Sequence, residues 1–244
     1  MAIELFSITL DDAFMLSPTT KHFIFHCATT PAFDYLPGQF ITLHFNNDDK
    51  PLRRSYSIAN VPSQNNRIEI AAGYVEGGAG TQLLFSLKPG DTLQASGPYG
   101  RLTLKENTPK RYILVATSTG ITPYRAMMTE LIKQIEKNPE LQVVILQGVQ
   151  RHHDILYRDE WTALAEQYPQ VKFHACLSRE DKSALLSNEY AGYVQQLFPE
   201  LNLNPKNDIV YLCGNPSMID DAFLQLKEQG FEIQHIIREK YISR

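Results

Sequence analysis

Hydrophobic and polar residues alternate along short stretches in the first part of the chain. Lys21–His26 and Gln39–Phe45 show the two-residue period, or the unbroken apolar run, that is typical of β-strands. Residues that favour turns separate such stretches, at 36–38, 46–49, 62–66 and 88–91. Short strands at regular intervals predict an antiparallel β-barrel or sandwich, and we place this domain at residues 1–105.

The pattern changes near residue 105. A polar stretch, 105–110, precedes Arg111–Ala116, a continuous apolar run of the kind found in buried parallel strands. Further strands are expected at 142–146, 171–176 and 209–213, with helices at 123–137, 157–167, 189–198 and 216–229. This alternation predicts a doubly wound α/β domain with a parallel sheet over residues 106–244.

One predicted strand combines a guanidinium group with an aromatic ring. The two-residue period places Arg54 and Tyr56 on one face and Ser57 on the other. The first face suits a ligand with a phosphate at one end and a flat ring at the other. The alternative is a half-buried strand in which Arg54 covers apolar surface and Tyr56 packs.

A glycine-rich stretch, 77–80, leads into Thr81 and then into an apolar helical turn. Thr81 is expected to be the N-cap of this short helix. Glycines before a helix N-terminus expose backbone N–H groups that can hold a phosphate, and a plain glycine loop is the alternative.

Two turns of the second domain follow predicted strands. The first contains Thr119, Gly120 and Pro123, with Ser118 where the dinucleotide fingerprint has its first glycine. The second is 213–218, in which Asn215 is suited to cap the following helix. Because strand C-terminal ends face the crevice of such sheets, we expect both turns to line one site.

Composition and charge limit the classes of function. The chain has 244 residues, of which 43% are hydrophobic, and a formal net charge of -4 without a basic run, which argues against a nucleic-acid partner. The three cysteines, Cys27, Cys176 and Cys213, form no Cys-x-x-Cys, so we predict no metal site. Scattered thiols, an acidic N-terminus and the lack of a long apolar run lead us to expect a cytoplasmic protein without a membrane span.

Taken together, these motifs resemble those of the ferredoxin–NADP+ reductase superfamily of FAD-dependent oxidoreductases, in order and over the whole chain. Arg54-Ser55-Tyr56-Ser57 resembles the flavin motif R-x-Y-S, which implies that Arg54 meets the FAD phosphates, Tyr56 packs on the isoalloxazine and Ser57 lies near N5. Gly80-Thr81 resembles the second FAD-phosphate segment.

The nicotinamide half carries the other motifs of this resemblance. The stretch 119–123 is similar to G-T-G-I-A-P, and 213–218 to C-G-x-P-x-M. The resemblance implies that Thr119, Gly120, Pro123, Gly214 and Met218 serve the nucleotide and that Cys213 lies beside the nicotinamide.

The resemblance also favours NADP over NAD. Ser178 and Arg179 resemble the segment that binds the adenosine 2′-phosphate, and Tyr193 the tyrosine that stacks on adenine, although the lysine usual at position 191 is replaced by alanine. Arg151 is a candidate for the missing positive charge. Glu180 and Asp181 keep NAD open, because an acidic side chain can hold the ribose 2′-hydroxyl.

The end of the chain resembles the ending E-x-Y of plant-type members. It implies that Tyr241 covers the flavin and that Glu239 tunes the site, although three further residues follow here. The alternative is an ordinary last strand with a frayed end.

The function that the resemblance implies is transfer of a hydride between NADP(H) and FAD, and of single electrons to or from ferredoxin, flavodoxin or another small iron–sulfur carrier. We expect a monomer. Three alternatives stay open: an NAD(P)H:flavin reductase, the reductase component of an oxygenase system, and a non-catalytic nucleotide-binding regulator, against which the intact Arg54, Tyr56, Ser57 and Cys213 argue.

Overall fold

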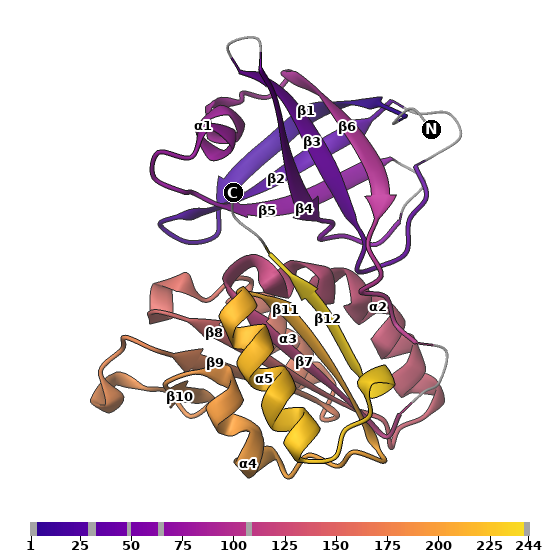
Figure 1. Cartoon of the computed structure of the whole chain (residues 1–244), viewed down its shortest axis with the longest axis vertical. Helices are drawn as coiled ribbons and strands as arrows, with labels where there is room; N and C mark the ends of the chain where they lie inside the picture. Colours follow the sequence, from indigo (N-terminus) through magenta and orange to yellow (C-terminus); the bar gives the residue numbers. More distant parts are fainter. Residues whose placement is uncertain (1–3, 29–32, 48–49, 63–65, 106–108, 242–244) are drawn as a thin grey trace. The chain divides into compact units, whose positions relative to one another are not determined.

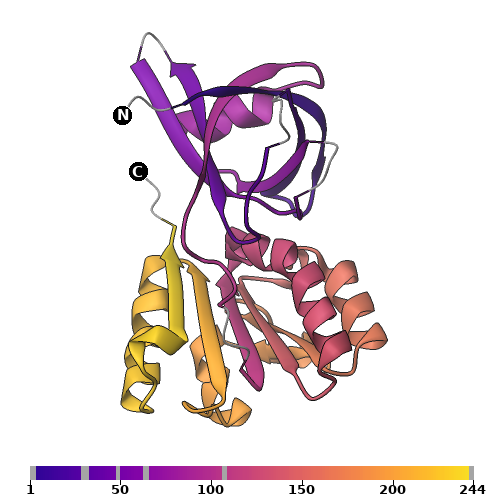
Figure 2. The same cartoon turned by 90° about the vertical axis from the view of Figure 1, so that its right-hand side faces the viewer.

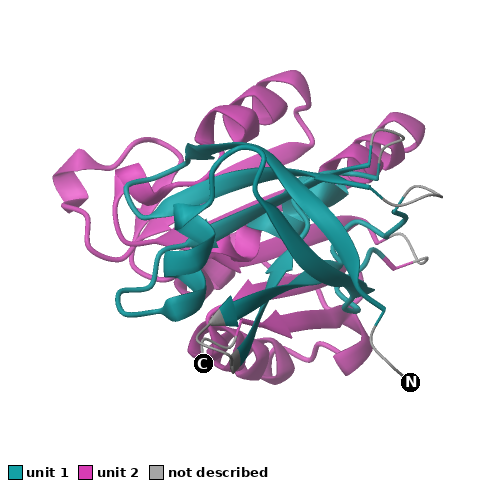
Figure 3. Ribbon diagram, turned by 90° about the horizontal axis from the view of Figure 1, so that it is seen from above, with its two compact units in different colours: residues 1–104, 122–127 teal, residues 105–121, 128–244 magenta. Residues whose placement is uncertain are grey.

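The computed structural model describes residues 4–28, 33–47, 50–62, 66–105 and 109–241. The chain divides into two compact units, which Figure 3 colours separately. The first contains residues 1–104 and 122–127, and the second contains 105–121 and 128–244. The first turn of helix α2 (Thr122–Lys137) thus groups with the N-terminal unit, although the sequence led us to place it in the second domain.

The first unit is an antiparallel β-barrel, as predicted. Its sheet has the order β4-β3-β6-β1-β2-β5, and a bridge between Ile58, just after β4, and Ile70 of β5 joins the two edges. Figure 2 shows the resulting barrel. Helix α1 (Ala79–Ser86) follows β5. The strands are β1 (Phe6–Met15), β2 (Thr20–Cys27), β3 (Phe40–Asn47), β4 (Lys50–Ser57), β5 (Arg67–Gly73) and β6 (Thr92–Tyr99).

The barrel core follows from the two-residue period of the strands. Phe23 and Phe25 on β2, and Ile41 and Leu43 on β3, are inaccessible to solvent. Successive residues of a strand point to opposite faces, so these pairs share the inner face. Fully burying one such side chain stabilises a fold by roughly 1.5–3 kcal/mol, which makes this interior the main support of β3 and β4.

The second unit is the predicted doubly wound α/β fold. Its sheet has the order β10-β9-β8-β7-β11-β12, and all neighbouring strands are parallel (Figure 1). The strands are β7 (Arg111–Thr117), β8 (Gln142–Val149), β9 (Val171–Leu177), β10 (Glu189–Ala191), β11 (Asp208–Gly214) and β12 (Ile236–Lys240). The chain moves from β7 to one side of the sheet through β8 and β9, and later to the other side through β11. The switch point therefore lies between β7 and β11.

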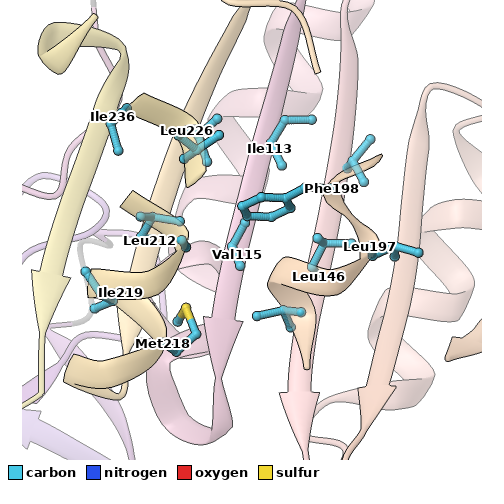
Figure 4. Packing of buried hydrophobic residues seen from close by; sticks show 14 of the residues in the cluster. Ile113, Val115, Leu146, Leu197, Phe198, Leu212, Met218, Ile219, Leu226 and Ile236 are labelled. Atoms are coloured by element: carbon cyan, nitrogen blue, oxygen red, sulfur yellow. The ribbon is translucent and has the colours of Figure 1, made fainter. Parts of the chain in front are cut away.

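Helices cover both faces of this sheet, as Figures 1 and 2 show from two directions. On one face lie α4 (Phe198–Leu201) and α5 (Pro216–Glu228), and on the other α3 (Arg158–Gln167) and the later turns of α2. Figure 4 shows the core on the α5 side, where Val115 and Leu212 of the central strands pack with Ile219 and Leu226 of the helix. Covering on both faces explains why these strands are apolar at nearly every position.

The helix that the sequence pattern predicted at 189–198 is wrong. The stretch forms the short strand β10 beside β9, then a 3-10 turn, Val194–Leu197, and the α-helix begins only at Phe198. Gly192 has φ +104°, a left-handed conformation that ends the strand and cannot continue into a helix. The apolar residues of this stretch are spaced as in a helix, but they come from a strand and a turn that pack into the same hydrophobic core.

Candidate functional site

The residues of β4 alternate as the sequence predicted. Arg54 and Tyr56 are partly buried, whereas Arg53 and Ser55 are exposed. Tyr56 packs against the barrel core, and burial raises the pKa of its phenol to about 12, with the nearby charge of Arg54 opposing part of the shift. A neutral ring and a guanidinium therefore lie on one face.

Arg54 lies across the first turn of α1. A Cβ atom at Gly80 would come within 2.8 Å of the Arg54 Cγ and 3.3 Å of its Nε, so glycine is needed for this approach. The N-cap of α1 is Gly78, which makes no side-chain capping hydrogen bond. The first N–H groups of a helix have no intrahelical acceptor, and they add partial positive charge next to the guanidinium. The arrangement suits a diphosphate.

The prediction that Thr81 is the N-cap of this helix is wrong. The Gly78 carbonyl already accepts from the Gln82 N–H at 3.0 Å, so the helix begins before Thr81. The Thr81 hydroxyl accepts from the Val75 N–H at 3.2 Å and shares its proton between the carbonyls of Gly78 (3.0 Å) and Val75 (3.1 Å). Thr81 therefore braces the loop that presents Gly80.

Ser57 leaves the exposed face because β4 ends there. It is 4% exposed, and the next two residues, Ile58 and Ala59, are also buried. The Ile58 N–H donates to the Gln39 carbonyl at 3.0 Å as the chain crosses toward β5. A strand end, not a bulge, removes Ser57 from the alternation.

The two turns of the second unit meet at the switch point between β7 and β11. A Cβ at Gly120 would lie 2.7 Å from the Cys213 carbonyl carbon and closer still to its oxygen, and one at Gly214 would lie 2.8 Å from the Thr117 carbonyl oxygen. The two glycines therefore let backbone pack on backbone. Ser118 takes φ +47°, a left-handed conformation that glycine adopts without strain. This explains why glycine is usual at the position that Ser118 occupies.

The turn after β11 is held by side chains on both sides. The Thr117 hydroxyl accepts from the Asn215 N–H at 2.8 Å. The Asn215 side chain in turn accepts from the Ser217 N–H at 2.8 Å, which confirms it as the cap of α5. Thr117 has no role in our sequence predictions, although a hydroxyl directly before a nucleotide-type turn was a usable signal.

Pro123 and Met218 follow the two turns in the sequence, each in the first turn of a helix. Pro123 stands in the first turn of α2 and is buried. Met218 is 6% exposed and belongs to the core on the α5 side of the sheet. Thr119, by contrast, is only partly buried within its turn.

Cys213, Glu239 and Tyr241 come together on β11 and the end of β12. Cys213 is level with Glu239 in the parallel register, and the Tyr241 N–H donates to the Gly214 carbonyl at 2.8 Å. Burial raises the pKa of the Cys213 thiol well above its usual value, the Glu239 charge adds to this, and a hydrogen bond with the Tyr241 side chain opposes it. The thiol is therefore neutral at physiological pH.

Burial also raises the pKa of Glu239 to about 7. Its carboxyl group therefore takes up and releases a proton closer to neutral pH than an ordinary glutamate does. The three residues that follow Tyr241 lie outside the described residues.

The loops after β8 and β9 bring Arg151, Ser178 and Arg179 together. The Ser178 N–H donates to the Val149 carbonyl at 3.0 Å, and the Arg179 N–H to the Gln150 carbonyl at 2.9 Å. These main-chain hydrogen bonds hold the two loops together at the C-terminal ends of adjacent strands, and both loops carry side chains of the type that binds phosphate.

A carboxylate lies within this group. Glu180 Oε1 is 3.8 Å from Arg151 Nη1, and Glu180 Oε2 accepts from the His152 N–H at 3.1 Å. The His152 N–H, outweighing partial burial and assisted by the positive charges nearby, lowers the pKa of Glu180. An anion bound here has to share Arg151 with Glu180.

Tyr193 lies beyond β10 with 61% of its surface exposed. The neighbouring Gly192 N–H donates to the Leu177 carbonyl at 2.9 Å, and the Tyr193 N–H donates to the Gln196 side chain at 2.9 Å. The backbone is fixed while the ring stays accessible to a flat ligand.

The described residues contain no cluster of three or more His, Cys, Asp or Glu that could hold a metal ion. Over the same part of the chain, no helix is long and apolar enough to cross a membrane.

Comparisons with known proteins agree with this geometry. Two family profiles match the sequence, "Oxidoreductase FAD-binding domain" over residues 7–104 and "Oxidoreductase NAD-binding domain" over residues 114–223. A protein of Sorangium cellulosum, "Ferredoxin--NADP reductase B", is 34% identical, and the match covers 93% of each chain. The "Toluate 1,2-dioxygenase electron transfer component" of Pseudomonas putida is 27% identical over 93% of this chain and 65% of that protein.

The fold is also that of solved structures. A ferredoxin NADP+ reductase from Neisseria gonorrhoeae with bound FAD and NADP has a TM-score of 0.84 at 21% identity, covering 99% of this chain and 100% of that one. An FAD-binding barrel followed by a nucleotide-binding α/β unit defines a two-domain flavin oxidoreductase that uses a nicotinamide nucleotide. The chain belongs to the ferredoxin–NADP reductase family and is an FAD-containing NAD(P)H oxidoreductase.

Proposed function

We propose that this enzyme exchanges a hydride with NADP(H) and exchanges electrons singly with a small carrier protein of the ferredoxin or flavodoxin class. The observation that carries the proposal is Arg54 lying on Gly80 at the uncapped start of α1, on the same face as Tyr56. The similarity to the Sorangium cellulosum reductase, over nearly the full length of both chains, supports the choice of a carrier protein.

In this proposal the barrel binds the flavin. Arg54 and the first N–H groups of α1 hold the FAD diphosphate, with Gly80 giving room and Thr81 bracing the loop. Tyr56 supports the isoalloxazine, and Ser57 presents its polar groups near N5. When bound, FAD supplies the chemistry, since it accepts two electrons as a hydride and releases them one at a time.

The second unit binds the nicotinamide nucleotide at the switch point. Gly120 and Gly214 let it approach the backbone, and Thr119 lines the turn. Cys213 offers a neutral, weakly polar sulfur to the nicotinamide, while Tyr241 fixes that thiol through their hydrogen bond. Glu239, with its pKa near 7, is placed to hold or release a proton on the same strand pair. The covering of the flavin by Tyr241 remains a prediction, as do the monomeric state and the cytoplasmic location.

NADP is the proposed nucleotide because the loops that carry Arg151, Ser178 and Arg179 are joined by main-chain hydrogen bonds, while the Tyr193 ring stays open for the adenine. Glu180 works against a 2′-phosphate by pairing with Arg151. We therefore expect Arg179 to contribute more than Arg151 to the preference for NADPH.

The test of the proposed function is a visible spectrum of the purified protein, followed by anaerobic titration. We expect flavin absorbance that NADPH bleaches at stoichiometric concentration, and reoxidation by ferredoxin or flavodoxin. A colourless protein that binds no added FAD, or a flavoprotein that NADPH and NADH both fail to reduce, would contradict the proposal.

Replacing Arg179 by alanine tests the nucleotide preference. Loss of a charge-assisted hydrogen bond, worth about 1.5–3 kcal/mol, should raise the KM for NADPH by about 10- to 100-fold and change that for NADH less than about twofold. Lys182→Ala, at an exposed position nearby, is the matched control and should leave both values unchanged. Equal increases for NADPH and NADH in Arg179→Ala would rule out the phosphate clamp.

A second candidate function is the reductase component of an oxygenase system. The similarity to the Pseudomonas putida electron transfer component favours it, but this chain spans only 65% of that protein. In that case the electron acceptor is a separate iron–sulfur protein, and ferredoxin and flavodoxin both fail to reoxidise the enzyme rapidly. If the product is instead free reduced flavin, the purified protein does not retain FAD.

A further inference from the structure

Arg125 joins two segments that are far apart in the sequence. It stands in the first turn of α2, and its guanidinium Nη1 donates to the Ala59 carbonyl at 3.0 Å and to Glu69 Oε2 at 2.8 Å. Its side chain is 25% exposed and that of Glu69 10%. All three residues belong to the first compact unit.

The acceptor of this ion pair is itself firmly held. Glu69 Oε2 is 3.2 Å from His22 Nε2, and Glu69 Oε1 is 2.8 Å from Arg67 Nε. Burial alone would raise the pKa of Glu69, but hydrogen bonds from His22 and Arg125 and the charge of Arg125 outweigh it and lower the pKa to about 2. The carboxylate therefore stays ionised.

The main chain around Glu69 is fixed as well. Its carbonyl accepts from the Ala59 N–H at 2.7 Å, and its N–H donates to the Asn60 side chain at 2.8 Å. Ala59 thus has both polar main-chain groups engaged, its N–H with β5 and its carbonyl with Arg125. The segment that follows β4 is held on both sides.

The contact joins two residues that lie just beyond the flavin motif and the nucleotide turn in the sequence. Ala59 is two residues after Ser57, the end of the flavin motif, and Arg125 is two residues after Pro123, the end of the nucleotide turn. One guanidinium therefore connects the chain just beyond each motif. Ion pairs removed from water often add little net stability, so the pair is better explained by the geometry that it fixes.

We propose that Arg125 is a positioning residue, which holds the first turn of α2, where Pro123 stands, in a fixed place against the flavin-motif segment through Ala59 and Glu69. The inference rests on the proposed function, because it concerns how the two motifs cooperate. Hydride transfer requires reacting atoms about 3–3.5 Å apart, and a misplacement of about 1 Å can cost about 100-fold in rate. Binding of either cofactor alone does not require this contact.

The experiment compares Arg125→Met, Arg125→Lys and Glu69→Gln with wild type, with Lys133→Met as a control on the exposed side of the same helix. Four quantities are measured in the purified holoenzyme: FAD content, KM for NADPH, the stopped-flow rate of flavin reduction at saturating NADPH, and hydrogen–deuterium exchange of peptides covering 117–127. Arg125→Met should slow reduction by about 10- to 100-fold, keep its FAD, and change KM by less than about threefold. Exchange at 117–127 should rise about tenfold.

A conservative variant and a double variant test whether the charge restores the reduction rate and whether Arg125 and Glu69 act as a pair. Arg125→Lys keeps the charge but replaces the planar guanidinium by a shorter, more flexible ammonium group, so it should recover part of the rate. Arg125→Met combined with Glu69→Gln should be no slower than Arg125→Met alone, since the residues act as a pair. Full additivity would overturn the proposal.

An unchanged reduction rate in Arg125→Met, or a loss of rate that matches its loss of FAD, would also overturn it. If Arg125→Met does not fold, Arg125→Lys and Glu69→Gln carry the same comparison. Failure of wild type to be reduced by NADPH would refute the proposed function instead, and the exchange measurement would still report on the contact itself.

Discussion

Arg54→Ala should yield a protein that loses most of its FAD during purification. The guanidinium lies across Gly80 at the start of α1, where the flavin diphosphate is proposed to bind. Removing one charged donor costs about 1.5–3 kcal/mol, and Arg54 offers two such contacts at a bidentate site. The Kd for FAD should therefore rise by about 100-fold or more. Isothermal titration calorimetry of FAD into the apoprotein measures this Kd.

Arg53→Ala is the matched control for this variant. Arg53 precedes Arg54 and is exposed, because β4 turns alternate residues to opposite faces. Its backbone carbonyl accepts a hydrogen bond from Arg54 Nη1 at 2.7 Å, and the substitution leaves that carbonyl in place. A similar weakening of FAD binding in both variants would show that net charge, not the position of Arg54, matters.

Gly120→Ala should nearly abolish reduction by NADPH while FAD remains bound. The added Cβ would overlap the Cys213 carbonyl group, and β7 and β11 are paired by a ladder of backbone hydrogen bonds that resists separation. Overpacking of this kind costs about 1–3 kcal/mol or more, and it moves both turns that hold the nucleotide. We expect the reduction rate to fall at least about 100-fold and the melting temperature to fall by several degrees.

Stopped-flow reduction and thermal unfolding of Gly120→Ala provide the measurement. Gly73→Ala serves as the control, because a Cβ at Gly73 would meet only the Thr20 hydroxyl, at 4.0 Å. If Gly120→Ala were reduced at the wild-type rate, the turn could accommodate the extra methyl group without disturbing the nucleotide. The close packing of the two turns would then not be required for nucleotide binding.

Local patterns in the sequence were enough to predict the fold of both units and several local features around the candidate site. The two-residue period of β4 placed Arg54 and Tyr56 on one face, and Asn215 before Pro216 marked the start of α5. Such features depend on neighbouring residues only. The side-by-side position of the turns after β7 and β11 also followed, because strand C-termini share one edge of a parallel sheet.

Features that depend on distant partners could not be predicted. Nothing near Arg125 in the sequence distinguishes it from a surface arginine, because its partner Glu69 is more than 50 residues away. In the same way, the pairing of Arg151 with Glu180 arises from two different loops. The wrong helix at 189–198 has another cause, since its apolar spacing fits a strand and turn as well as a helix.

The switch point also has a consequence for how the protein folds. In β7, Arg111 is level with Gln142 of the next strand, about 30 residues away, but its ion pair with Asp208 of β11 spans 97 residues. Closing the longer loop costs about 1 kcal/mol more in chain entropy. We therefore expect β11 to join the sheet after β7 and β8 have paired, so that the nucleotide site takes shape late. Defects in these turns should then accelerate unfolding more than they slow folding.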